Sequence, residues 1–170
     1  MQKNKKIAKI LLDIGCVNIN FKNPFTLTSG KLSPVYVDCR KMISFPKERE
    51  TIINEMIKQI KYKYNKDIYI AGGETAGIPY AALISQKMKE PMIYIRKQPK
   101  GFGRGKLIEG EFKKNSQSIL IEDMATDAGS KLHFVKALRS NKLIINDIFV
   151  AFYYGVYKSA DLNLKKMKVN

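Results

Sequence analysis

The chain has 170 residues, 45% of them hydrophobic, which suits one globular domain with a sizeable core. Its formal net charge is +16, but only five of its 31 basic residues are Arg, and the lysines are spread along the whole chain. Scattered lysine is typical of a solvated surface, and no RNA-binding motif with interleaved aromatic residues accompanies it, so sequence-specific nucleic-acid binding is disfavoured. Because no apolar run approaches a membrane span and the N-terminus lacks a signal-peptide core, we expect a cytoplasmic protein without membrane contact.

The first third of the chain predicts two helices separated by an extended region. Apolar residues recur at helical spacing over residues 7–14, and Gly15 is placed to end this helix. Residues 25–38 alternate short extended pieces with turn signals. Residues 46–64 indicate a long helix with Ser44 as a possible N-cap.

A first strand, loop and helix follow. Residues 68–71 are apolar enough for a buried parallel strand, residues 72–77 read G-G-E-T-A-G, and residues 78–88 resume as a helix. Open α/β sheets bind ligands beyond the carboxyl ends of their strands, so this loop is a candidate binding segment. Taken alone, G-G-x-x-x-G is a weak motif, and a simple turn is the alternative.

A basic segment follows the next predicted strand, Met92–Ile95. Its cations alternate with glycine and proline, which disfavours a helix and predicts a mobile loop. These cations are Arg96, Lys97, Lys100, Arg104 and Lys106. Such a loop can close over a polyphosphate and neutralise a leaving group. The alternative is a solvated basic loop.

Residues 118–132 read S-I-L-I-E-D-M-A-T-D-A-G-S-K-L and predict a strand, a loop and a helix. Free N–H groups at a helix start favour a phosphate. Glu122 and Asp123 would repel that phosphate, so they need another role, such as binding sugar hydroxyls or magnesium. As neighbours at a strand end, their side chains should diverge. The alternative is an ordinary turn with Asp127 or Ser130 as N-cap.

Residues 144–154 form the last predicted strand, and the chain from residue 158 gives no clear signal. His133 has no evident partner in sequence, so we interpret it as structural. The alternation of strands and helices predicts an α/β fold with a central parallel sheet flanked by helices. Because no linker interrupts the chain, we expect a single domain over residues 1–170.

Four stretches together resemble a known family. S-I-L-I-E-D-M-A-T-D-A-G-S resembles the phosphoribosyl diphosphate signature of type I phosphoribosyltransferases. F-T-L-T-S-G-K-L-S-P-V-Y-V-D, G-G-E-T-A-G-I-P and Y-I-R-K-Q-P-K-G-F-G precede it in the order found in orotate phosphoribosyltransferases. The resemblance extends from about residue 7 to residue 157, and it implies a type I phosphoribosyltransferase fold with a small N-terminal hood over the base.

The resemblance also implies an activity, which is transfer of a phosphoribosyl group to orotate in pyrimidine biosynthesis. It implies magnesium held mainly through the diphosphate, and a homodimer with active sites shared across the interface. The implied catalytic residues are Lys100, Asp123 and Glu122. The implied substrate-binding residues are Thr28, Lys31, Arg96, Lys97, Lys100, Arg104, Glu122, Asp123, Met124, Ala125, Thr126, Asp127, Ala128, Gly129 and Ser130.

The sequence departs from the family pattern at several positions. Thr28 and Ala76 stand where the family has lysine, Phe102 replaces a histidine, and Ala128 replaces a glycine. No arginine for the base follows the last strand. Because members of the family usually continue beyond this point, we expect the chain to be shortened or divergent at its C-terminus. These departures leave open a phosphoribosyltransferase for another nucleobase, a non-catalytic regulator that binds phosphoribosyl diphosphate, or a basic RNA-binding module.

Overall fold

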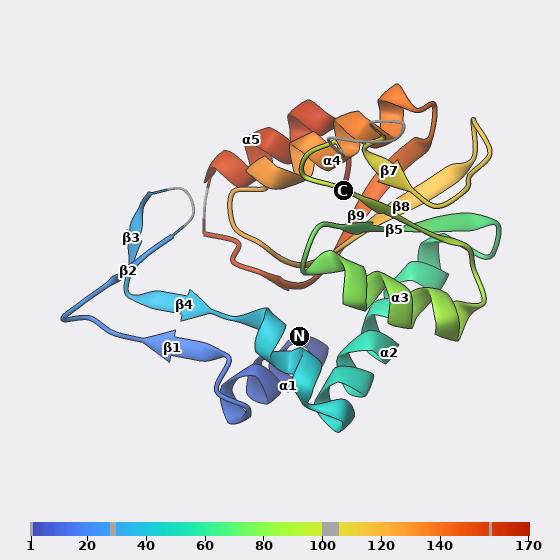
Figure 1. Ribbon diagram of the computed structural model, residues 1–170. Helices are drawn as coiled ribbons and strands as arrows, with labels where there is room; N and C mark the ends of the chain where they lie inside the picture. Colours follow the sequence, from blue (N-terminus) through green and yellow to red (C-terminus); the bar gives the residue numbers. More distant parts are fainter. Residues whose placement is uncertain (1, 28–29, 100–105, 157) are drawn as a thin grey trace. The chain divides into compact units, whose positions relative to one another are not determined.

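The computed structural model describes residues 2–27, 30–99, 106–156 and 158–170 (Figure 1). The chain divides into two compact units, residues 1–52 and residues 53–170. Within the described residues, no helix has both the length and the apolar character needed to cross a membrane.

The first unit begins with helix α1 (Gln2–Asp13), which starts earlier than the predicted residue 7. Its apolar stripe turns inward, with Leu11 buried and Ile7 and Ile10 half-buried. Gly15 adopts a left-handed φ of +66° and donates its N–H to the carbonyl of Leu12 at 2.9 Å. This conformation favours glycine and ends the helix, as predicted.

Two short antiparallel ribbons follow α1 in the first unit. Strand β1 (Val17–Ile19) pairs with β4 (Val35–Val37), and β2 (Phe25–Thr26) pairs with β3 (Leu32–Ser33). The rings of Phe25 and Tyr36 lie 5.6 Å apart between centroids. The prediction of short extended pieces over residues 25–38 is therefore confirmed.

A 3₁₀ helix, η1 (Cys39–Ser44), follows β4, and the carboxylate of Asp38 accepts the N–H of Arg40 at its start. The sequence suggested Ser44 as the N-cap of the next helix, and this was wrong. Ser44 ends η1, and helix α2 (Pro46–Lys63) begins at Pro46. Proline suits the first helical position because its φ is already helical and no N–H is lost there.

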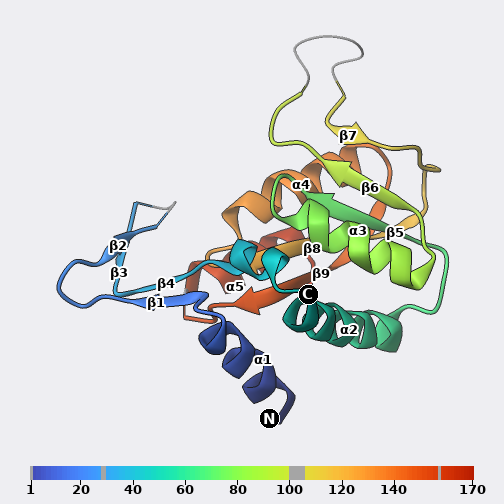
Figure 2. The same cartoon turned by 60° about the horizontal axis from the view of Figure 1, so that its bottom comes forward.

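The second unit contains a five-stranded sheet in the order β7-β6-β5-β8-β9. Strands β5 (Ile68–Gly73), β6 (Met92–Ile95), β8 (Gln117–Ala125) and β9 (Ile144–Tyr153) are parallel, and Figure 2 shows them side by side. Strand β7 (Ile108–Glu109), which the sequence did not predict, is antiparallel to β6.

Helices cover both faces of this sheet (Figure 1). Helix α3 (Gly77–Met88) packs on one face, where a Cβ on Gly72 would lie 3.0 Å from the Cβ of Ala81. Helices α4 (Gly129–Ser140) and α5 (Lys158–Met167) lie on the other face. There Phe134 and Met167 join a buried cluster with Leu120. The predicted α/β class is confirmed, and the lysine-rich end that gave no signal forms a helix.

Candidate active site

Three predicted functional segments meet at the carboxyl edge of the sheet. Strands β6, β5 and β8 are neighbours, with Gly73 opposite Ile95 and Gly72 opposite Ile121. The chain leaves β5 at Glu74, leaves β6 at Arg96 and leaves β8 after Ala125. Parallel strands of an open sheet present their ligands at this edge, so the arrangement is that of a binding site.

Strand β8 is longer than its apolar core suggested. The sequence placed the acidic pair after the strand, and this was wrong, because Glu122 pairs with Val150 and Ala125 with Tyr153 of β9. Glu122, Asp123, Met124 and Ala125 therefore belong to β8. The adjacent ladder of β9 extends the strand, and this long-range pairing is not visible in the local pattern.

The loop between β8 and α4 is short and tightly bonded. Ala128 has a left-handed φ of +59° and precedes α4 without a side-chain cap. The carboxylate of Asp127 accepts the N–H of Gly129 at 3.0 Å, and its backbone carbonyl accepts a bond of 2.7 Å from Asn163 of α5. Thr126 and Asp127 are half-buried, and Gly129 and Ser130 are exposed. Of the two capping alternatives, Asp127 makes a turn contact, and Ser130 lies inside the helix.

The acidic pair has the predicted divergence. Glu122 lies on the α4 face, where its Oε2 accepts a 2.8 Å bond from Nζ of Lys131. Alternation along β8 places Asp123 on the opposite face, and its Oδ1 accepts the N–H of Met124. Both acidic residues are buried. Burial raises the pKa of the Glu122 carboxyl, and the charge and hydrogen bond of Lys131 oppose this shift.

The loop after β5 approaches β8 closely. A Cβ on Gly73 would lie 1.8 Å from Oε1 of Glu122, and a Cβ on Gly77 would lie 2.4 Å from the carbonyl of Ile121. The two glycines therefore permit a backbone approach that other residues would block. The peptide between Glu74 and Thr75 is cis.

Three contacts fix the start of the basic segment. The N–H of Arg96 donates to the carbonyl of Leu107 at 2.8 Å, and the Arg96 carbonyl lies 3.2 Å from Nε2 of His133. The carboxylate of Glu74 accepts the N–H of Lys97. His133 thus contacts the backbone of the basic segment, and its structural role stays a prediction.

Some predicted site residues cannot be placed with the others. Thr28, Lys100 and Arg104 lie outside the described residues, so their assignments stay predictions. Lys31 is exposed and belongs to the first unit. In contrast, two residues that the sequence did not single out, Glu74 and Lys131, have side chains that bond to the site segments.

The donor set does not build a metal site of its own. Among the described residues, no group of three or more His, Cys, Asp or Glu side chains is placed to hold a metal ion. Glu122 already pairs with a lysine. Magnesium held mainly through the diphosphate therefore stays a prediction from the sequence.

The fold and the site together define an α/β protein in which the β8–α4 loop, an acidic pair and a basic segment lie at one edge of the sheet. No protein-family model matches the chain. An orotate phosphoribosyltransferase from Ruegeria sp. (strain TM1040) is 46% identical over 152 residues, covering 88% of this chain and 67% of that protein. One from Dinoroseobacter shibae is 42% identical over 159 residues, covering 92% of this chain and 70% of that protein.

Solved structures agree with these relatives. The crystal structure of orotate phosphoribosyltransferase from Aeropyrum pernix matches with a TM-score of 0.81 and 26% identity, covering 96% of this chain and 89% of that chain. The fold is therefore that of the type I phosphoribosyltransferases. More particularly, the chain belongs to the orotate phosphoribosyltransferase family.

Proposed function

We propose that the protein transfers the phosphoribosyl group of 5-phosphoribosyl 1-diphosphate to orotate, giving orotidine 5′-phosphate and diphosphate in pyrimidine biosynthesis. The observation that supports this most is the convergence of the β5–α3 loop, the acidic pair and the basic segment at one sheet edge. The substrates in this proposal are those of the orotate phosphoribosyltransferase family, to which the chain belongs.

The sugar phosphate is proposed to bind at the β8–α4 loop. Backbone N–H groups over Thr126, Asp127, Ala128, Gly129 and Ser130 would hold the 5-phosphate, because a helix start favours an anion. Met124 and Ala125 would set the path of the chain into this loop. Asp123 is the proposed catalytic carboxylate for the ribose hydroxyls. Glu122, which the resemblance also implied as catalytic, is bonded to Lys131 and packed against the β5–α3 loop, so its proposed role is to support the site beside Asp123.

The diphosphate is proposed to bind between the β5–α3 loop and the basic segment. Arg96, Lys97, Lys100 and Arg104 would neutralise it as it leaves, and the magnesium ion that accompanies it would reduce its charge further. Bond breaking places positive charge on the sugar and negative charge on the leaving group. Carboxylates and cations that are fixed in place favour this charge separation over the ground state, so no covalent nucleophile is needed.

The remaining parts of the proposal concern the base and the assembly. Thr28 and Lys31 would contact the base from the hood, and the protein would act as one phosphoribosyltransferase domain over residues 1–170. It would be a cytoplasmic homodimer that shares active sites between its subunits. These assignments follow from the family resemblance of the sequence.

A direct assay tests the activity. Purified protein is mixed with phosphoribosyl diphosphate and magnesium, and orotate consumption is followed by ultraviolet absorbance, with uracil, adenine and hypoxanthine in parallel. We expect consumption of orotate alone. Turnover of another base would replace the substrate, and binding of phosphoribosyl diphosphate without any turnover would favour a regulator.

A further inference from the structure

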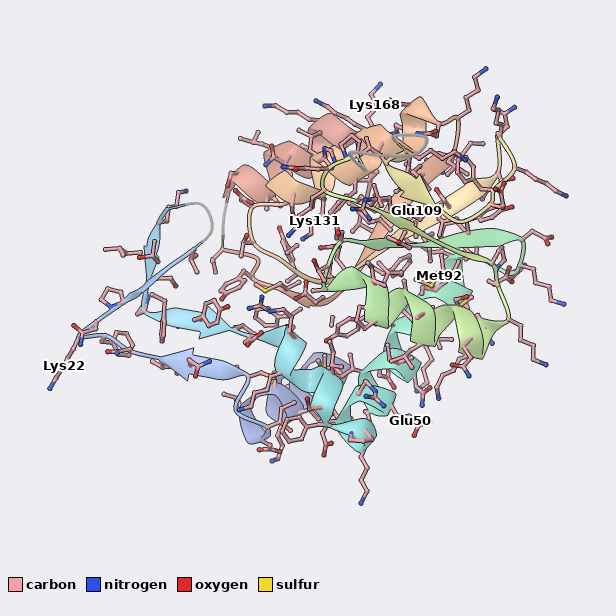
Figure 3. All side chains as sticks on the ribbon, viewed as in Figure 1. Lys22, Glu50, Met92, Glu109, Lys131 and Lys168 are labelled. Atoms are coloured by element: carbon pink, nitrogen blue, oxygen red, sulfur yellow. The ribbon has the colours of Figure 1, made fainter. Side chains whose placement is uncertain are left out.

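Lys131 occupies an unusual place for a lysine. It lies in the first turn of α4, where the helix dipole disfavours a cation, and its side chain is 8% exposed. Figure 3 labels it beside α4, in contrast to Lys22 and Lys168, which are exposed. Lysine is almost never buried unless it is paired. The position of Lys131 therefore depends on its bonded partners.

These partners lie at the two ends of the β8–α4 loop. Nζ of Lys131 donates to Oε2 of Glu122 at 2.8 Å and to Oγ of Ser130 at 3.2 Å. Glu122 precedes the loop on β8, and Lys131 follows it on α4. The ion pair thus joins the strand and the helix on either side of the loop that would hold a phosphate.

The ion pair is a poor device for stability alone. Removing two charges from water is costly, and a pair of apolar side chains in the same place is often at least as stable. Within the described part of the chain, Oε1 of Glu122 is also buried without a hydrogen-bond partner. An unsatisfied buried oxygen adds a further cost. The pair is therefore better explained by what it positions.

The surroundings of Glu122 extend its effect to the second loop. Its Oε1 lies where a Cβ on Gly73 would come within 1.8 Å and a Cβ on Gly77 within 2.8 Å. The carboxylate is therefore packed against the start and end of the β5–α3 loop. Because Oε1 is covered, Glu122 would have to move to meet a sugar hydroxyl, whereas its present contacts suit a support for the loops.

We propose that Lys131 is a positioning residue, which through its ion pair with Glu122 holds the β8–α4 loop in the conformation that binds a phosphate. This inference rests on the proposed function in taking the loop as the 5-phosphate site. The proposal concerns the binding of phosphate, so it can be tested without measuring the turnover of orotate. Lys131 acts here through Glu122 and Ser130 and does not need to contact the phosphate.

Calorimetric binding of inorganic phosphate and ribose 5-phosphate tests the proposal with three variants. Lys131→Met should weaken both ligands about tenfold, the loss of one charge-assisted contact, and lower the melting temperature because Glu122 is left unpaired. The double variant Glu122→Gln with Lys131→Met leaves no unpaired charge, so it should recover the melting temperature but not the affinity. Lys136→Met, an exposed lysine on the same helix, should bind as the wild type does.

Several results would overturn the proposal. Recovery of affinity together with melting temperature in the double variant would show that the pair serves stability only. If the variants bound ribose 5-phosphate more weakly but bound inorganic phosphate with unchanged affinity, Glu122 would be assigned to the sugar hydroxyls. A wild-type protein that binds neither ligand would remove the phosphate site itself, whereas normal binding without orotate turnover would count against the proposed function alone.

Discussion

The carboxylate of Glu74 accepts a hydrogen bond of 2.6 Å from the backbone N–H of Lys97. The backbone N–H of Glu74 in turn donates to the carbonyl of Ile95 at 2.9 Å. Glu74 therefore continues the pairing of β5 with β6 beyond the last strand residues and joins the β5–α3 loop to the start of the basic segment. Both segments belong to the proposed diphosphate site, so this bond sets their spacing.

Substitution of Glu74 should impair use of phosphoribosyl diphosphate. Glu74→Ala removes the acceptor for Lys97, and the loss of a hydrogen bond to a charged group is about 1.5–3 kcal/mol, so kcat/KM should fall by roughly tenfold or more. Glu74→Gln keeps a carbonyl oxygen and should retain most of the activity. Equal losses in the two variants, measured by steady-state kinetics, would mean that the charge matters and the bond to Lys97 does not.

The stability of the sheet should depend on pH through Asp147. Burial raises the pKa of this carboxyl, but hydrogen bonds from Lys63 and Tyr64 and the charge of Lys63 outweigh it and lower the pKa. The stability gained is present above the usual Asp pKa of about 3.9 and is lost as the pH falls through the lower, folded-state pKa. Urea unfolding from about pH 5 down to pH 2 should show this loss.

Asp147→Asn is the variant that isolates this contribution. It should lower the free energy of unfolding at neutral pH by about 1–3 kcal/mol, and it should make the loss of stability between neutral and acid pH smaller. Asp13→Asn is the matched control, because Asp13 makes an exposed pair with Lys9 on α1. Such a pair is worth less than about 1 kcal/mol. An unchanged acid fall in Asp147→Asn would assign the pH dependence to other carboxylates.

Substitutions at two glycines should affect different properties, stability at Gly73 and phosphate binding at Gly129. A Cβ on Gly73 would lie 1.8 Å from Oε1 of Glu122 and 2.7 Å from a ring carbon of Phe134, so Gly73→Ala should lower the melting temperature strongly. A Cβ on Gly129 would meet only ordinary contacts with Asp127, at 3.4 Å or more. Gly129→Ala should keep the melting temperature and weaken phosphate binding. A stable Gly73→Ala protein would show that Glu122 can move aside.

Asp123 provides a test of the hydroxyl-binding assignment. Asp123→Asn keeps an oxygen that can accept the N–H of Met124, so the fold should survive. Loss of the negative charge should reduce kcat/KM for phosphoribosyl diphosphate by about a hundredfold, because stabilisation of the transition state is lost. Asp161→Asn on the exposed side of α5 is the control. Normal kinetics in Asp123→Asn would remove this residue from the mechanism.

Local sequence signals predicted most of the second unit. Strand β6 and the helices α3 and α4 appear where apolar periodicity and small-residue loops indicated them. The same signals placed Arg96, Lys97 and the β8–α4 loop after strands of one sheet, because alternating strands and helices imply a parallel sheet. The carboxyl ends of those strands then had to share one edge.

Contacts between distant residues were not predictable in this way. Glu74 lies 23 residues before its partner Lys97, and Lys131 lies nine residues after Glu122. In the sequence, nothing distinguishes Glu74 or Lys131 from a charged residue on the surface. The antiparallel strand β7 has only two residues, which is too short for a periodic pattern, and α5 was concealed by its many lysines.

The bond from Asn163 to the carbonyl of Asp127 connects α5 to a loop that is synthesised before it. Since a chain folds from its N-terminal part during translation, the β8–α4 loop leaves the ribosome without this partner. The loop acquires its last restraint only when α5 has emerged and packed against α4. A nascent chain that stops before α5 would therefore have the strands of the site without a finished loop.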